Sequence, residues 1–126
     1  MVELSTGECW RRLGEARIGR LAIATDHGAE VFPVNHLVRD GSVVLRSAPG
    51  TKLLELARHP DVAFEVDGRR GRRTWSVVLR GRAERMDSDI DIAESGVRGL
   101  RTDHPGEKFN YVRIRPDEVS GRRFDG

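Results

Sequence analysis

Two cations and two hydroxyl groups fall within seven residues, where an apolar segment predicted as a strand meets a leucine-rich segment predicted as a helix. The segment reads Arg46-Ser47-Ala48-Pro49-Gly50-Thr51-Lys52. Free backbone N–H groups and the positive dipole end of a helix attract an anion at such a junction. Arg46 and Lys52 would add charge-assisted hydrogen bonds, each contributing roughly 1.5 to 3 kcal/mol. This chemistry suits a phosphate group.

A plainer interpretation of the same segment is equally open from the local pattern. Thr51 would then be only a helix N-cap, Pro49 and Gly50 only a turn, and the two cations only solvated surface groups.

Length and composition set the frame for this candidate site. The 126 residues fit one domain, residues 1–126, that is large enough to hold a core without staples. A formal net charge of +2 is too small to imply a nucleic-acid partner. The single cysteine excludes an intrachain disulfide and fits a reducing compartment. With neither a secretory signal nor a membrane-spanning segment, the protein is expected to be cytoplasmic, without membrane contact.

The elements that must position the candidate site are mostly strands. Ser5 and Glu8 form a capping box that starts a short helix ending at Gly14. The turn Asp40-Gly41 joins two strands of a three-stranded meander. The strands of that meander are expected at residues 21–24, 31–38 and 42–47, followed by a helix over 51–58.

The second half of the chain continues this pattern. Further strands are expected at residues 62–67, 75–83, 109–115 and 119–124, with a helix that starts after residue 87 or 88. Gly81 indicates a bulge or bend within the long fifth strand.

Many short strands without a βαβ rhythm predict a mainly β fold, a small antiparallel barrel of six or seven strands with short peripheral helices. A barrel of this size is filled by its own side chains. A ligand is therefore expected on the outer wall or at a subunit interface.

Pro33 lies within an expected strand and removes a ladder N–H, which indicates an edge where a planar ligand could use backbone groups. The alternative favoured by the residues alone is a protective proline beside a surface residue, His36. No metal site is predicted, because His27, His59 and His104 lack a second ligand at metal spacing. No nucleophile elbow or Cys/His pair is present, so no catalytic residue is assigned and any catalysis would require a cofactor.

Residues 69–73, Arg-Arg-Gly-Arg-Arg, form the one basic cluster in the sequence. Such a cluster could contact a phosphate backbone. Only Trp75 lies near enough to stack on bases, so a solvated loop is expected and nucleic acid is an unlikely partner.

Six motifs follow one another along the chain. They are GRLA at 19–22, PVNH at 33–36, DG at 40–41, RSAPGTK at 46–52, FEVD at 64–67 and WSVVLRGRA at 75–83. Together they resemble the pyridoxamine 5'-phosphate oxidase-like family of FMN-binding split barrels, over nearly the whole chain. The resemblance implies a split β-barrel and a homodimer with two FMN molecules at the subunit interface, outside the barrels.

The resemblance also implies which residues hold the cofactor. The FMN phosphate would be held by Arg46 and Ser47 at the strand end and by Thr51 and Lys52 at the helix start. The isoalloxazine ring would lie along Pro33, Val34, Asn35 and His36, largely through their backbone groups. Ser76 would make a polar flavin contact, and Trp75 would reach the ring or the dimer seam.

The implied activity is hydride transfer between FMN and an unidentified small substrate. The chain departs from true pyridoxamine phosphate oxidases, because those are longer, carry Arg and Trp in a closing C-terminal segment, and have a longer cation at His36 and a further arginine near Val31. Oxidation of pyridoxamine phosphate is therefore not expected. Relatives of this fold use the deazaflavin F420 or bind haem, so the alternatives are an F420-dependent reductase and a non-catalytic flavin-binding protein.

Overall fold

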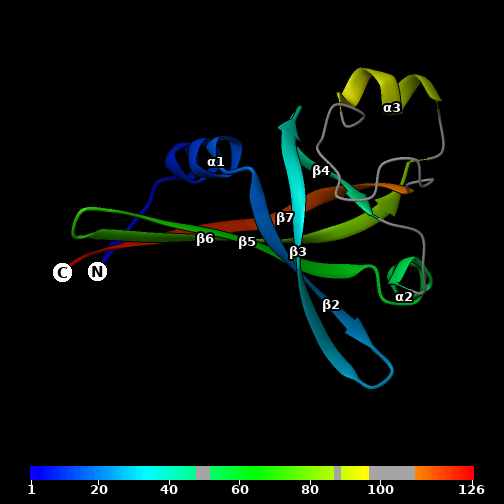
Figure 1. Cartoon of the computed structure of the whole chain (residues 1–126), viewed down its shortest axis with the longest axis horizontal. Coiled ribbons are helices and arrows are strands. Elements are labelled where there is room, and N and C mark those ends of the chain that lie inside the picture. The colour runs from blue at the N-terminus through cyan, green and yellow to red at the C-terminus, as the bar shows by residue number, and fades with distance from the viewer. Residues whose placement is uncertain (48–51, 87–88, 97–109) are drawn as a thin grey trace.

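The computed structural model describes residues 1–47, 52–86, 89–96 and 110–126 (Figure 1). The elements in chain order are β1 (Val2–Glu3), α1 (Thr6–Glu15), β2 (Ile18–Thr25), β3 (Gly28–Arg39), β4 (Ser42–Ser47), α2 (Lys52–Arg58), β5 (Asp61–Arg70), β6 (Arg73–Arg85), α3 (Asp89–Ser95) and β7 (Asn110–Asp125). Among the described residues, no helix combines the length and apolarity needed to cross a bilayer.

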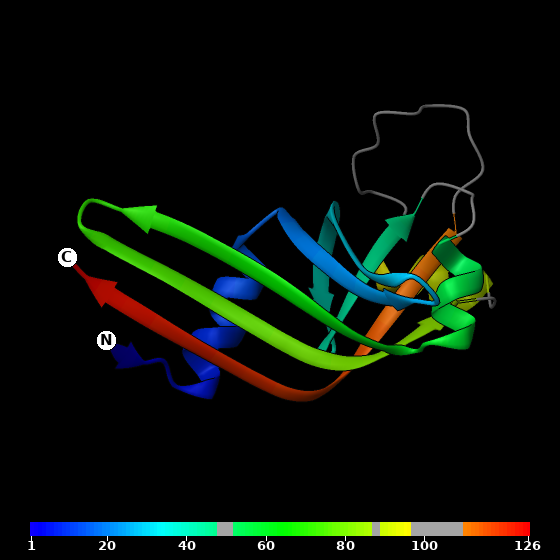
Figure 2. The same cartoon turned by 90° about the horizontal axis from the view of Figure 1, so that it is seen from below.

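The strands close a ring of antiparallel pairs. The sheet order is β1-β7-β4-β3-β2-β5-β6, and β6 pairs back onto β7, so that β1 alone lies outside the ring. Strands β5, β6 and β7 continue beyond the ring as a long arm that runs toward both termini, with α1 beside it (Figure 2). The mainly β, antiparallel barrel predicted from the sequence is confirmed.

The interior of the ring is filled by alternate side chains of each strand, as expected for a small barrel. Phe64 of β5 lies at its centre with no exposed surface, and Leu13 of α1 is equally buried. A second, smaller cluster lies outside the ring, where Ile92 of α3 packs with Val44 and Met86. Because both faces of β4 are covered in this way, Val43, Val44 and Leu45 are all fully buried.

Local signals in the sequence explain the turns and the first helix. The Ser5 side chain accepts a hydrogen bond from the Glu8 N–H at 3.1 Å, which confirms the predicted N-cap of α1. Asp40 and Gly41 both have positive φ, at 52° and 70°, as a two-residue hairpin turn that matches strand twist requires.

One prediction about the strands is wrong. The sequence predicted separate strands at 109–115 and 119–124, but β7 is continuous from Asn110 to Asp125. Its register against β6 shifts between Arg80 and Gly81, so β7 bulges at Asp117 and passes Pro116 without ending. An irregularity does occur at Gly81, as predicted, but the extra residue lies in β7 and not in the fifth strand of the prediction, β6. The short strand β1 was not predicted.

Candidate functional site

The barrel opens between β3 and β4. Within the described part of the chain, residues 28–35 of β3 pair only with β2, and β3 pairs with β4 only from His36 to Arg39. On the other side of the opening, Arg46 and Ser47 lie in the ladder with β7, beyond the register of β3 with β4, which ends at the pair His36–Leu45. Among the described residues, this leaves one edge of β3 and the last two residues of β4 facing each other across a split in the sheet.

The open edge of β3 presents the backbone groups of alternate residues. The His36 N–H donates to the carbonyl of Arg17 at 3.2 Å, so the backbone groups of even-numbered residues face β2. The N–H and carbonyl groups of Val31 and the carbonyl of Pro33 therefore point away from β2. A proline costs no ladder hydrogen bond there, and the prediction that Pro33 marks an edge is confirmed.

The side chains of Val34 and His36 point into the barrel. His36 is 3 % exposed, its Nε2 lies 2.9 Å from the Leu13 carbonyl, and its ring meets that of Phe64 edge-on with 4.7 Å between centroids. Desolvation lowers the pKa of His36, and the bond to Leu13 opposes this in part. The alternative that His36 is a surface residue is wrong. The side chains of Val34 and His36 are buried and their backbone groups face β2, so these two residues direct neither toward the opening.

The residues predicted to hold the phosphate, Arg46, Ser47, Thr51 and Lys52, form the predicted phosphate cradle. Arg46 is the one whose side chain the structure describes. It is half-buried at the end of β4, and its guanidinium lies 5.7 Å from the ring of Tyr111, its partner on β7. Lys52 begins α2, as predicted. Thr51 lies outside the described residues, and the structure describes only the backbone of Ser47 and Lys52.

Trp75 and Ser76 lie on the arm. Successive residues of a strand face opposite sides, so these two side chains do not share a site. The Trp75 indole packs over Gly68, where a Cβ atom would come within 2.9 Å of it, and the guanidinium carbon of Arg12 lies 4.0 Å above the ring. Ser76 instead lines a hollow with Val78 and Ser120 on the other face.

The arm and the cradle are far apart within one chain. Trp75 pairs with Arg123 and Arg46 pairs with Tyr111, both on β7. Twelve residues of strand span roughly 40 Å along its length. One chain therefore brings Pro33 and Arg46 to the same opening but does not bring Trp75 or Ser76 to it.

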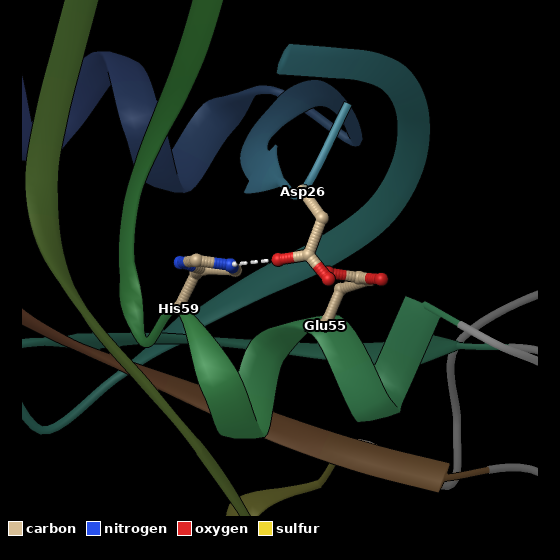
Figure 3. A group of neighbouring side chains, drawn as sticks. All are labelled: Asp26, Glu55 and His59. Carbon is tan, nitrogen blue, oxygen red and sulfur yellow. Dashed lines mark hydrogen bonds and ion pairs between the residues drawn. The ribbon is translucent and has the colours of Figure 1, made fainter. Parts of the chain in front are cut away.

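A cluster of metal-binding residue types was missed by the sequence analysis. Asp26 of the β2–β3 turn meets Glu55 and His59 at the end of α2, and one ligand atom of each lies within 4.8 Å of the others (Figure 3). His59 Nε2 is 3.1 Å from Asp26 Oδ1, and Arg58 donates to Asp26 Oδ2 at 2.8 Å. The pKa of Asp26 is lowered chiefly by the hydrogen bond to His59 and next by the charge of Arg58. The four-residue spacing of Glu55 and His59 was the available signal.

Comparison with known proteins identifies the family. The family model described as pyridoxamine 5'-phosphate oxidase matches residues 5–123. The chain belongs to this family. The resemblance inferred from the six motifs is therefore confirmed, and with it the split-barrel fold.

Solved structures of similar proteins extend this result. A candidate pyridoxamine 5'-phosphate oxidase from Corynebacterium glutamicum is 35% identical, with a TM-score of 0.88 over 99% of this chain and 98% of that one. An FAD-binding protein from Mycobacterium smegmatis is 33% identical, with a TM-score of 0.84 over 99% of both chains. An FAD-binding protein from Mesorhizobium loti is 30% identical, with a TM-score of 0.86 over 98% of this chain and 97% of that one.

Proposed function

We propose that this chain binds a flavin nucleotide, FMN in the first instance, in the opening between β3 and β4 and acts as a homodimeric oxidoreductase on a small substrate. The observation that carries the proposal is the open backbone edge of β3 facing Arg46 across the split, in a chain of the pyridoxamine 5'-phosphate oxidase family. A bound flavin would supply the hydride chemistry. The protein would supply position and hydrogen bonds.

The two sides of the opening suit the two ends of a flavin nucleotide. Arg46, together with Lys52 at the start of α2, would pair with the phosphate by charge-assisted hydrogen bonds. The edge of β3 offers a carbonyl at Pro33 and both backbone groups at Val31, which suit the donors and acceptors of a planar ring system. The buried His36 and Val34 would hold this edge in place from inside the barrel.

FAD is the competing cofactor, because two of the similar solved structures are of FAD-binding proteins. FAD contains the riboflavin 5'-phosphate unit of FMN, so the same cradle would contact both through the shared phosphate. Titration of the purified chain with FMN, FAD and F420, followed by mass spectrometry of any molecule that copurifies, distinguishes the three. Protein that is colourless and ignores all three would overturn the proposal.

The test of the cradle compares FMN with riboflavin, which lacks the phosphate. We expect Arg46→Ala to weaken FMN binding by roughly 10- to 150-fold, the equivalent of one charge-assisted hydrogen bond, and to leave riboflavin binding within about twofold. Arg39→Ala, an exposed arginine of the preceding strand, is the matched control and should leave both affinities unchanged. Equal losses for the two ligands would mean that Arg46 does not contact the phosphate.

The homodimer is proposed because Trp75 and Ser76 lie too far along the arm to reach the opening of their own chain. If a partner chain supplies them, Arg46→Ala and Trp75→Leu subunits should complement each other. One of the two sites in each mixed dimer would then carry both native residues, and random mixing should restore about a quarter of the wild-type binding sites. No recovery on mixing, with dimers formed, would place both residues in the same chain's site or Trp75 outside it.

Catalysis is tested separately from binding. The photoreduced holoprotein should be reoxidised by a quinone, a nitro compound or oxygen faster than free flavin is. Reoxidation no faster than that of free flavin would make the chain a flavin carrier.

A further inference from the structure

The cluster of Asp26, Glu55 and His59 has the composition and spacing of a metal site. The 3.1 Å between His59 Nε2 and Asp26 Oδ1 is close to the separation of two ligand atoms on one zinc ion. Bonds of about 2.0 to 2.1 Å at tetrahedral angles place ligand atoms roughly 3.3 Å apart. One carboxylate oxygen of Glu55 lies within 4.8 Å of a ligand atom of Asp26 and of a ligand atom of His59, so side-chain rotations would bring all three residues onto one ion.

Glu55 gives a second and independent indication. Its Oε2 is buried and accepts no hydrogen bond from the described residues. A buried carboxylate oxygen without a donor is costly, and the nearby carboxylate of Asp26 adds repulsion. Arg58 and His59 both bond to Asp26. A cation placed between the two carboxylates would satisfy Glu55 and remove the repulsion together.

The backbone holds these groups in register without any metal. Glu55 and His59 lie one helical turn apart, and the His59 N–H donates to the Glu55 carbonyl at 2.7 Å. Leu56, which is buried, anchors α2 to the barrel between them. In the hairpin turn, the Thr25 hydroxyl accepts from the His27 N–H and donates to the Gly28 carbonyl, which fixes the turn that carries Asp26.

Arg58 orients the Asp26 carboxylate through a hydrogen bond. It binds Oδ2 at 2.8 Å and leaves Oδ1 directed toward His59. Hydrogen-bonded partners of this kind commonly fix the direction of a ligating carboxylate. Two carboxylates face a single guanidinium in this cluster, and this excess of negative charge favours a divalent cation.

We propose that Asp26, Glu55 and His59 bind a divalent transition-metal ion, with zinc as the representative ion. Imidazole nitrogen combined with carboxylate oxygen suits zinc and its first-row neighbours better than magnesium or calcium, which take oxygen ligands. Three protein ligands leave a fourth position for water. The ion would tie the β2–β3 turn to the end of α2. This proposal does not depend on flavin binding, since none of the three residues lies at the opening.

The experiment uses the full chain without an affinity tag, since a histidine tag binds the same ions. Zinc is titrated by calorimetry, and Co²⁺ is titrated by its visible absorption, which reports coordination by nitrogen and oxygen ligands. We expect one ion per chain, and at least a tenfold loss of affinity in His59→Gln, Glu55→Gln and Asp26→Asn. His27→Gln is the matched control, because His27 adjoins Asp26 in the same turn and is exposed. It should bind as the wild type does.

A measurement on the wild-type chain covers the case in which a variant fails to fold. Co²⁺ should selectively shift or broaden the NMR signals of residues near 26, 55 and 59, and zinc should raise the melting temperature. Absence of stoichiometric binding by the wild type would make the cluster an ion-pair network only. Equal losses in His27→Gln and His59→Gln, or paramagnetic effects centred elsewhere, would also overturn the proposal.

Discussion

Gly19 is a position where one methyl group should destabilise the barrel. Gly19 belongs to β2 and pairs with Val34 on β3, opposite the open edge. A Cβ atom added there would lie within 2.8 Å of three ring atoms of Phe64. Carbon atoms at rest lie about 3.5 to 4.0 Å apart, so the methyl group and the ring must separate by roughly 1 Å or more.

The ring of Phe64 has little room to move away. It has no exposed surface, and the His36 ring lies against it with 4.7 Å between centroids. Overpacking of this kind costs about 1 to 3 kcal/mol. Replacing glycine by alanine also restricts the unfolded chain, which returns about 0.4 to 1 kcal/mol. We therefore expect Gly19→Ala to lower the free energy of unfolding by about 1 to 2 kcal/mol.

Urea unfolding of a double-mutant cycle tests this reasoning. Phe64→Leu removes the ring atoms that the new methyl group would meet, so Gly19→Ala should cost almost nothing in that background. The coupling free energy should reach about 1 kcal/mol. Gly14→Ala is the control, because nothing lies within 4 Å of its added Cβ and alanine favours the helix, so it should be neutral or stabilising. Additive effects of Gly19→Ala and Phe64→Leu would refute the account.

Two further predictions concern groups that contact these elements. Burial lowers the pKa of His36, so the unfolded chain binds a proton that the folded chain does not. The free energy of unfolding should therefore fall as the pH drops below about 6.5 toward the lower folded pKa. Unfolding of His36→Gln, measured as a function of pH, should lack that part of the slope. Arg12→Met should cost about 0.5 to 1 kcal/mol, because it keeps most of the packing over Trp75 but loses the cation, and Trp75 fluorescence should report the change; an unchanged spectrum and midpoint would contradict the contact.

Local patterns predicted most of the strands because the chain marks their ends with turn residues. Asp40-Gly41 set the β3–β4 hairpin, and the alternation around Phe64 set β5. Pro33 was a reliable sign of an unpaired edge, since a proline within a strand is tolerated where no N–H is required. The opening between β3 and β4 could thus be anticipated from one residue type.

Other features depend on contacts distant in sequence and were not predictable in this way. A strand was predicted to end at residue 115, but β7 continues through Pro116 because its bulge at Asp117 lies beside Gly81, thirty-six residues earlier in the chain. A Cβ atom at Gly81 would meet the Arg115 backbone. Likewise, Glu55 and His59 are visible as a helical pair, but only the fold brings Asp26 to them across the barrel end. Contacts between segments that are distant in the sequence leave no local pattern from which they could be predicted.

In β3, different residues serve the stability of the barrel and the proposed binding of the ring, and this decides how the site must be tested. Its even-numbered residues, Val34 and His36, fill the barrel, whereas the outward backbone groups belong to odd-numbered positions. Alanine substitutions along β3 would therefore change stability and leave the proposed ring contacts in place. Only a change that removes a backbone donor tests those contacts directly. Val31→Pro removes the N–H that points away from β2 while sparing the hydrogen bonds to β2, so it should weaken riboflavin and FMN equally. Arg46→Ala, in contrast, should weaken FMN alone, and this difference between the two variants separates the ring end of the site from its phosphate end.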